Sequence, residues 1–174
     1  MCKLLGNVHA PCVAENGVWL YDPRGNEYLM DPAITSAQLE MVHEASAWLR
    51  QEYGPLGVTQ QPGKAASISL YHPQTQVLKD IHPVIAERFD AKGWPLRVSM
   101  TWLYINCDLS HVSKATGMRR LLDLVGVKPE RAAGIGDTMI APPPTRPYAA
   151  ELGADPGSLR IVVLDHHPFG GPLH

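Results

Sequence analysis

A chain of 174 residues is long enough for one domain or two small lobes, and 45% hydrophobic with 18% charged residues is a globular composition. The formal net charge of −2 offers no basic surface for nucleic acid, and no apolar run approaches the roughly 20 residues of a membrane span. The three cysteines, Cys2, Cys12 and Cys107, are too widely spaced for a disulfide framework or a CxxC metal pair. We therefore expect a cytoplasmic protein with free thiols that binds neither nucleic acid nor membrane.

The first predicted elements form a hairpin. Residues 8–14 are short and mostly apolar, as in a strand, and 18–21 are typical of the returning strand. Between them, Glu15, Asn16 and Gly17 are a turn signal of the hairpin type. A second turn is expected over residues 22–26.

A helix and a strand follow. Thr35 or Ser36 can cap a helix that runs to residue 53, where Gly54 and Pro55 end it. The apolar stripe of this helix comprises Leu39, Val42, Ala45 or Ser46, and Leu49. Residues 57–66 are expected to be a loop, and the alternation over 67–71 predicts a half-buried strand.

Residues 75–92 have a second helical stripe, interrupted by a proline. The stripe consists of Val77, Ile81, Ile85 and Phe89. Because Pro83 lies inside it, we expect a kink or a break there. Two further strands are predicted over residues 96–100 and 102–107.

The last third continues the alternation of strands and helices. Ser113 caps a helix to residue 125, and Gly126 ends it. Its expected buried residues are Met118, Leu121, Leu122 and Val125, whereas Arg119 and Arg120 are expected on an exposed face. Strands are predicted over 132–135 and 159–164, with a short helix over 148–152 after a proline-rich stretch. This order of elements predicts an α/β fold.

The chemistry of the chain centres on two charged residues. Lys114 lies at the start of a helix, where its ammonium and the helix amides both favour an anion. Asp137 follows the carboxyl end of a buried strand, the edge where ligands bind in open α/β sheets. Lysine can neutralise a phosphate, an aspartate can hold Mg²⁺, and Thr138 can add a hydroxyl. These residues suit phosphoryl transfer.

The segment that carries both charges, VSKATGMRRLLDLVGVKPERAAGIGDT (112–138), resembles the lysine motif and the acidic motif of the haloacid dehalogenase superfamily. The likeness is strongest to sugar-phosphatase-like members with a large α/β cap, because Glu15-Asn16-Gly17 resembles the hairpin that precedes the cap. The resemblance covers roughly residues 11–140. It implies a partial three-layer parallel-sheet core (1–22 and 108–174) and a cap-like lobe (23–107). It also implies that Lys114 is catalytic and binds phosphate with Thr138, and that Asp137 holds Mg²⁺.

Two parts of the family pattern are absent from the sequence. There is no DxDxT or DxDxV nucleophile motif, since Asp22, Asp31 and Asp108 each stand alone. Ala141 stands where relatives have a second carboxylate, which weakens the expected Mg²⁺ site. Our hypothesis is that the chain is truncated at its N-terminus and divergent after about residue 140.

The resulting functional hypothesis is a phosphatase-type hydrolase for a small phosphorylated metabolite, weak or inactive for lack of a nucleophile. The alternative is a non-catalytic relic or a phosphate-binding module. A third reading is a DHH-type metal phosphoesterase, in which Asp165, His166 and His167 follow a strand as metal ligands. Because a missing core strand would leave sheet edges open, we also expect self-association through those edges.

Overall fold

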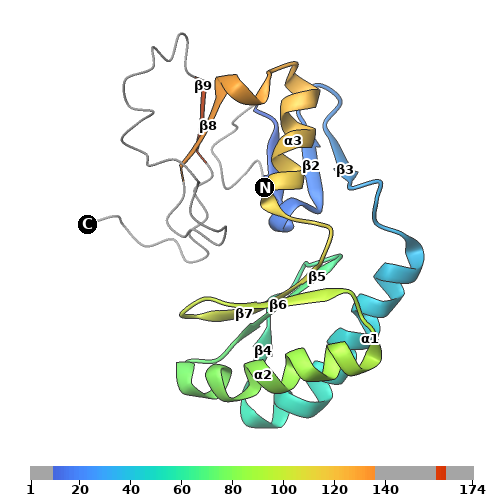
Figure 1. Ribbon diagram of the computed structural model, residues 1–174, viewed down its shortest axis with the longest axis vertical. Helices are drawn as coiled ribbons and strands as arrows, with labels where there is room; N and C mark the ends of the chain where they lie inside the picture. The colour runs from blue at the N-terminus through green and yellow to red at the C-terminus, as the bar shows by residue number, and fades with distance from the viewer. Residues whose placement is uncertain (1–9, 136–159, 164–174) are drawn as a thin grey trace. The chain divides into compact units, whose positions relative to one another are not determined.

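The computed structural model describes residues 10–135 and 160–163 (Figure 1). The chain divides into two compact units, Met1–Leu121 and Leu122–His174, and the boundary falls within helix α3 (Lys114–Val125). The described helices and sheets make it an α/β protein, as predicted. The lobe boundaries expected from the sequence stay a prediction. Within the described part, every helix is too short or too polar to cross a membrane.

The predicted hairpin is confirmed and gains a third strand. Strands β1 (Cys12–Ala14) and β2 (Trp19–Asp22) pair antiparallel around the one-turn helix η1 (Glu15–Gly17). Strand β3 (Glu27–Met30), which the sequence analysis did not predict, pairs antiparallel with the other side of β2. Its side chains are mostly exposed, so it lacks the strong apolar alternation that marks a strand.

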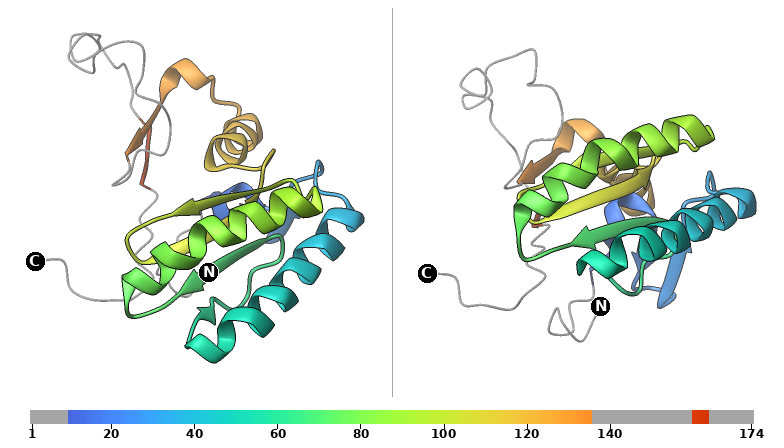
Figure 2. Two further views of the ribbon diagram at one scale, coloured as in Figure 1. Left: turned by 60° about the horizontal axis from the view of Figure 1, so that its bottom comes forward. Right: turned by 90° about the horizontal axis from the view of Figure 1, so that it is seen from below.

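Two helices cover one face of a second sheet, a four-stranded antiparallel sheet of order β4-β5-β7-β6 (Figures 1 and 2). The strands are β4 (Thr59–Gln60), β5 (Ser67–Tyr71), β6 (Leu96–Met100) and β7 (Tyr104–Leu109). The helices are α1 (Ser36–Tyr53) and α2 (Thr75–Lys92), and the short η2 (Gly54–Leu56) follows α1. Thr35 caps α1 with a capping box shared with Gln38, which confirms the predicted start.

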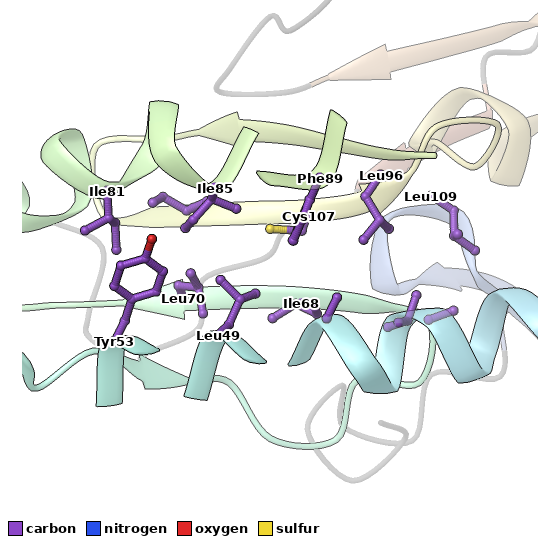
Figure 3. Packing of buried hydrophobic residues seen from close by; sticks show 14 of the residues in the cluster. Leu49, Tyr53, Ile68, Leu70, Ile81, Ile85, Phe89, Leu96, Cys107 and Leu109 are labelled. Carbon is purple, nitrogen blue, oxygen red and sulfur yellow. The ribbon is translucent and has the colours of Figure 1, made fainter. Parts of the chain in front are cut away.

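The apolar core lies between this sheet and its helices. Alternate residues of β5 and β7, such as Ile68, Leu70 and Cys107, point toward the helices and are almost fully buried (Figure 3). Helix α2 contributes Ile81, Ile85 and Phe89 from its predicted stripe. The burial of these aliphatic and aromatic groups is the main stabilising contribution to this layer.

Strand β5 corrects one expectation. It was predicted to be half-buried, but Ser67 and Ser69 on its polar face are also buried. Ser67 is covered because it donates a hydrogen bond to Glu15 of η1, 3.0 Å away. Ser69 donates to Asn106 of β7 at 2.7 Å. The second face is therefore closed by hydrogen bonds between distant segments, which alternation in the sequence does not reveal.

Of the kink or break expected at Pro83, the structure contradicts the break. The helix runs unbroken from Thr75 to Lys92. Pro83 and Lys79, whose carbonyl loses its helical partner, both lie on the exposed side. Water can satisfy that carbonyl, while Ile81 and Ile85 anchor the helix on either side of the proline.

The second unit begins in the last turn of α3. Leu122 is buried as predicted and Val125 is 40% exposed, so the prediction for Val125 was wrong. Gly126, with a φ of +67°, ends the helix as expected. A short η3 (Pro129–Arg131) then leads to β8 (Ala132–Ile135), which pairs in parallel with β9 (Arg160–Val163). Both strands were predicted, whereas the predicted helix over 148–152 lies outside the described residues.

Candidate anion site

The site is organised by the turn η1, whose backbone is unusual. Glu15, Asn16 and Gly17 have consecutive positive φ angles of 51°, 53° and 109°. Side-chain-bearing residues adopt this left-handed region at a cost of roughly 1 kcal/mol or more, so surrounding contacts must hold them there. The contacts of Glu15 and Asn16 reach segments 50 or more residues away.

Gly17 lets the turn approach the first turn of α3. A Cβ atom on Gly17 would collide with the carbonyl oxygen of Ser113. A Cβ on Gly117 would lie 2.6 Å from Val13 Cγ1 and 2.7 Å from Gly17 Cα. Two glycines therefore allow backbone-to-backbone packing where α3 begins, which places Lys114 beside the turn.

Glu15 fastens the loop that precedes β5. Its Oε1 accepts hydrogen bonds from the backbone N–H groups of Ala65 and Ala66, each at 2.8 Å, and from the Ser67 hydroxyl at 3.0 Å. Its Oε2 accepts from Trp19 Nε1 at 3.0 Å. One carboxylate thus satisfies four donors from two separate segments, and charge-assisted bonds of this kind are the stronger class.

Asn16 makes a second contact with a distant part of the chain. Its Nδ2 donates to Oδ1 of Asp108, near the end of β7, at 3.0 Å. Asp108 is only 6% exposed, and its Oδ2 lies 3.8 Å from the guanidinium of Arg97 on the neighbouring strand β6. Arg97 also donates to the carbonyl of Val112, just before α3. The negative charge of Asp108 is therefore compensated by the amide of Asn16 and the guanidinium of Arg97.

Helix α3 begins with a reciprocal cap that confirms the role predicted for Ser113. Its hydroxyl accepts from the N–H of Thr116 at 3.2 Å, and its own N–H donates to Thr116 Oγ1 at 2.9 Å. Lys114 is the first helical residue and is exposed. This is the position predicted for it, at the positive end of the helix dipole.

A second cation, Lys64, joins Lys114. The pKa of Lys64 is lowered, chiefly because burial disfavours its charged form. The carboxylates of Glu15 and Asp108 act in the opposite direction, and the positive charge of Lys114 lowers the pKa further. Neither lysine forms an ion pair or a hydrogen bond within the described ranges. Two lysines whose charges interact, and which form no ion pair there, are a candidate site for an anion.

The three isolated aspartates all have structural partners. Asp22 pairs with Arg24 at 2.8 Å on the surface, and this hydrogen bond lowers the pKa of Asp22. Asp31 lies 3.4 Å from Arg120, and Asp108 is held as described above. Each of these three aspartates is therefore already engaged with a partner.

Arg120 was predicted on an exposed face together with Arg119, and for Arg120 this was wrong. Arg119 is exposed, but the side chain of Arg120 is only 20% exposed. Arg120 donates to the carbonyls of Gly17 at 3.1 Å and Leu29 at 2.9 Å. The helical stripe did not predict this, because the partners belong to a sheet about 100 residues earlier in the chain.

The other predicted site residues cannot be placed beside these lysines. Asp137, Thr138 and Ala141, and the Asp165-His166-His167 run, lie outside the described residues. Among the residues that are described, no three His, Cys, Asp or Glu side chains gather as a metal site would require. The described part therefore contains two lysines that could attract an anion but no group of side chains that could hold Mg²⁺.

Lys64 also borders a cavity of about 430 Å³ beside α1. Its wall includes Ser46, Arg50 and Gln60, but neither Lys114 nor Asp108. The Gln60 side chain already accepts a hydrogen bond at Oε1 from the Ser46 hydroxyl, at 2.7 Å. The cavity is thus a separate hollow on the helix side of the loop, and Lys64 is what the two regions share.

Glu15, Asn16, Lys64 and Asp108 were not predicted as site residues. Glu15-Asn16-Gly17 was predicted as a turn and as resembling the hairpin that precedes the cap, without a role in a site, and Lys64 is one lysine in a Pro-Gly loop. The one signal that could have indicated the site was the pair of glycines, Gly17 and Gly117, each next to a charged or polar segment. Their mutual contact becomes visible only in three dimensions.

Comparison with known proteins gives partial similarities. No family model matches the chain. Two curated proteins, the 6-aminohexanoate-cyclic-dimer hydrolases of Pseudomonas sp. (strain NK87) and Paenarthrobacter ureafaciens, are each 49% identical over 51 residues. That match covers 29% of this chain, and the chain spans only 9% of the length of either relative.

Similar solved structures include three phosphatases, at low sequence identity. The IMP-nucleotidase of Plasmodium falciparum is 14% identical, with a TM-score of 0.49 over 68% of this chain and 33% of that one. The C-terminal domain of trehalose-6-phosphate phosphatase from C. albicans is 19% identical, with a TM-score of 0.48 over 70% and 43%. Sucrose-phosphatase from Synechocystis sp. is 14% identical, with a TM-score of 0.43 over 74% and 52%. Similarities of this size do not assign a family.

Proposed function

We propose that this chain is a phosphatase-like protein of the haloacid dehalogenase type that binds the phosphate group of a small phosphorylated metabolite with little or no turnover. The observation that carries the proposal is the pair Lys64 and Lys114. Lys114 is the first residue of α3, whose start packs against the turn η1, and Glu15 of that turn holds the loop that precedes β5 and contains Lys64. The charge of Lys114 lowers the pKa of Lys64, and neither lysine forms an ion pair or a hydrogen bond in the described part of the chain.

A phosphate dianion suits this pair electrostatically. Holding a second ammonium beside Lys114 in a partly buried position is unfavourable, and a bound dianion would relieve both the repulsion and the lost solvation. The N-terminus of α3 adds its partial positive charge, which favours anions at the same end. Glu15 and Asp108 hold the surrounding loops through hydrogen bonds instead of neutralising either lysine at close range.

Turnover needs groups that the described residues do not supply. Transfer through an aspartyl-phosphate requires a free carboxylate nucleophile, and Asp22, Asp31 and Asp108 are engaged. Asp137 would hold Mg²⁺, which would neutralise phosphate charge when bound, and Ala141 weakens that site. The engaged aspartates favour the second candidate function, a phosphate-binding module without chemistry.

Titration of the purified full chain with inorganic phosphate, with and without Mg²⁺, tests the proposal. We expect saturable binding that Lys64→Met and Lys114→Met each weaken by about tenfold or more, because a charged hydrogen bond contributes roughly 1.5–3 kcal/mol. Lys79→Met, at an exposed position on α2, is the matched control and should bind like the wild type. Absence of binding in the wild type, or equal affinity in all variants, contradicts the proposed site.

The same samples separate the two candidate functions. Hydrolysis of a generic aryl phosphate that requires Mg²⁺ and disappears in Lys114→Met would identify an enzyme. Binding without hydrolysis is the expected outcome and identifies a binding module.

A further inference from the structure

Arg120 joins three segments that are separate in the sequence. Its guanidinium donates to the carbonyl of Gly17 in η1 and to the carbonyl of Leu29 in β3. It also lies 3.4 Å from Asp31, which precedes α1 and is only 7% exposed. Figure 1 shows α3 beside the strands that carry these partners. Arg120 therefore ties α3 to the open end of the β2–β3 hairpin, where Trp19 pairs with Met30.

The geometry requires a guanidinium. Two of its nitrogens donate to carbonyls of two different segments, η1 and β3, and one of them also faces the carboxylate of Asp31. A lysine ammonium is a single point charge and cannot reach the two carbonyls and the carboxylate together. Arg120→Lys therefore keeps the positive charge but loses the divergent N–H donors. Arg119, the adjacent residue, is exposed and provides a control of identical chemistry on the same helix.

The contacts of Arg120 fix residues that determine the positions of both lysines. Gly17, whose carbonyl Arg120 holds, is in backbone contact with Ser113, the residue before Lys114. Glu15 on the same turn fastens the loop that carries Lys64. Displacement of this turn relative to α3 would therefore move Lys64 and Lys114 with respect to each other.

We propose that Arg120 is a positioning residue, which fixes η1 against the start of α3 and thereby sets the placement of Lys64 and Lys114 for a phosphate group. The inference rests on the proposed phosphate site. Arg120 acts through the turn and the helix and does not itself touch the anion.

The first measurement is phosphate affinity in folded variants of the full chain. Arg120→Lys is expected to weaken phosphate binding by about tenfold, whereas Arg119→Lys is expected to stay within about twofold of the wild type. Arg120→Met should weaken phosphate binding further. If Arg120→Met does not fold, the comparison of Arg120→Lys with Arg119→Lys is sufficient for the test. Equal affinity of Arg120→Lys, Arg119→Lys and the wild type overturns the inference.

The second measurement needs no ligand. Hydrogen exchange of the backbone amides of residues 15–17 and 113–117 should be faster in Arg120→Lys than in Arg119→Lys, while the amides of α1 remain unchanged. If the wild type binds no phosphate, the proposed function fails, and this comparison alone decides whether Arg120 orders the turn and the helix start. Equal exchange in the two variants overturns the positioning role in that case.

Discussion

The two faces of the four-stranded sheet are held by different physics. The face toward α1 and α2 is filled by aliphatic and aromatic side chains, including Leu70, Phe89 and Ile105, which are almost fully buried. The opposite face is closed by hydrogen bonds from η1, with Glu15 and Asn16 reaching β5 and β7. The same strands contribute to both faces. This comparison indicates that the apolar face stabilises the fold, whereas the polar face fixes the positions of charged side chains.

The strongest test of this division removes the largest fully buried side chain of the apolar face. Phe89 is fully buried, and its ring lies 5.5 Å from Trp94 and 6.1 Å from Trp48. Phe89→Ala is expected to lower the free energy of unfolding by about 3–5 kcal/mol, because lost transfer energy and the cavity left behind add together. Urea denaturation measures it. A loss below about 1 kcal/mol would show that this face is not the stabilising one.

Removal of the carboxylate of Glu15 is the corresponding test on the polar face. Glu15→Ala leaves the donors of Ala65, Ala66, Ser67 and Trp19 without their acceptor. We expect a loss of about 2–3 kcal/mol in urea denaturation and weaker phosphate binding, because the Lys64 loop is released. Glu87→Ala, which removes an exposed carboxylate of α2, should cost far less. Equal losses in the two variants would refute the special role of Glu15.

The glycine pair at the helix start provides a smaller, steric test. Gly117→Ala places a Cβ against Val13 and Gly17, so we expect a loss of about 1–2 kcal/mol despite the better helix propensity of alanine. Gln51→Ala, at an exposed position of α1, is the control, and it should be neutral or slightly stabilised in thermal unfolding. A stabilised Gly117→Ala would contradict the close approach.

The smallest expected effect concerns pH. Because the pKa of Lys64 is lowered from 10.5, the unfolded chain binds more protons than the folded one between the lowered value and 10.5. Stability should therefore rise as pH increases through this alkaline window, more in the wild type than in Lys64→Met. Phosphate affinity should fall over the same window, because neutral Lys64 no longer attracts the anion. Parallel pH profiles of stability in the two proteins would contradict the lowered pKa.

Local pattern was sufficient for most elements of the fold. The stripe around Val42 and Leu49 predicted α1, and the cap at Thr35 predicted its start. Ser113 likewise predicted the beginning of α3 and with it the position of Lys114. These predictions succeed because helix periodicity and capping depend on residues within about four positions of one another.

Errors arose where a distant segment changed the environment of a residue. Ser67 was expected on an open face and is buried against Glu15, and Arg120 was expected in solvent and is bonded to Gly17 and Leu29. Pro83 was expected to interrupt α2, but anchoring on both sides and an exposed carbonyl allow the helix to continue. None of these environments is encoded within a short window.

The sequence by itself determined the α/β class, most helix and strand positions, the lysine at the start of α3 and the lack of a DxDxT or DxDxV motif. Only the tertiary structure decided that Lys64 joins Lys114 and that Glu15, Asn16 and Arg120 hold the parts around them. The physical reason is the range of the interactions: periodicity and capping are local, whereas these hydrogen bonds and charge interactions join residues about 50 to 100 positions apart.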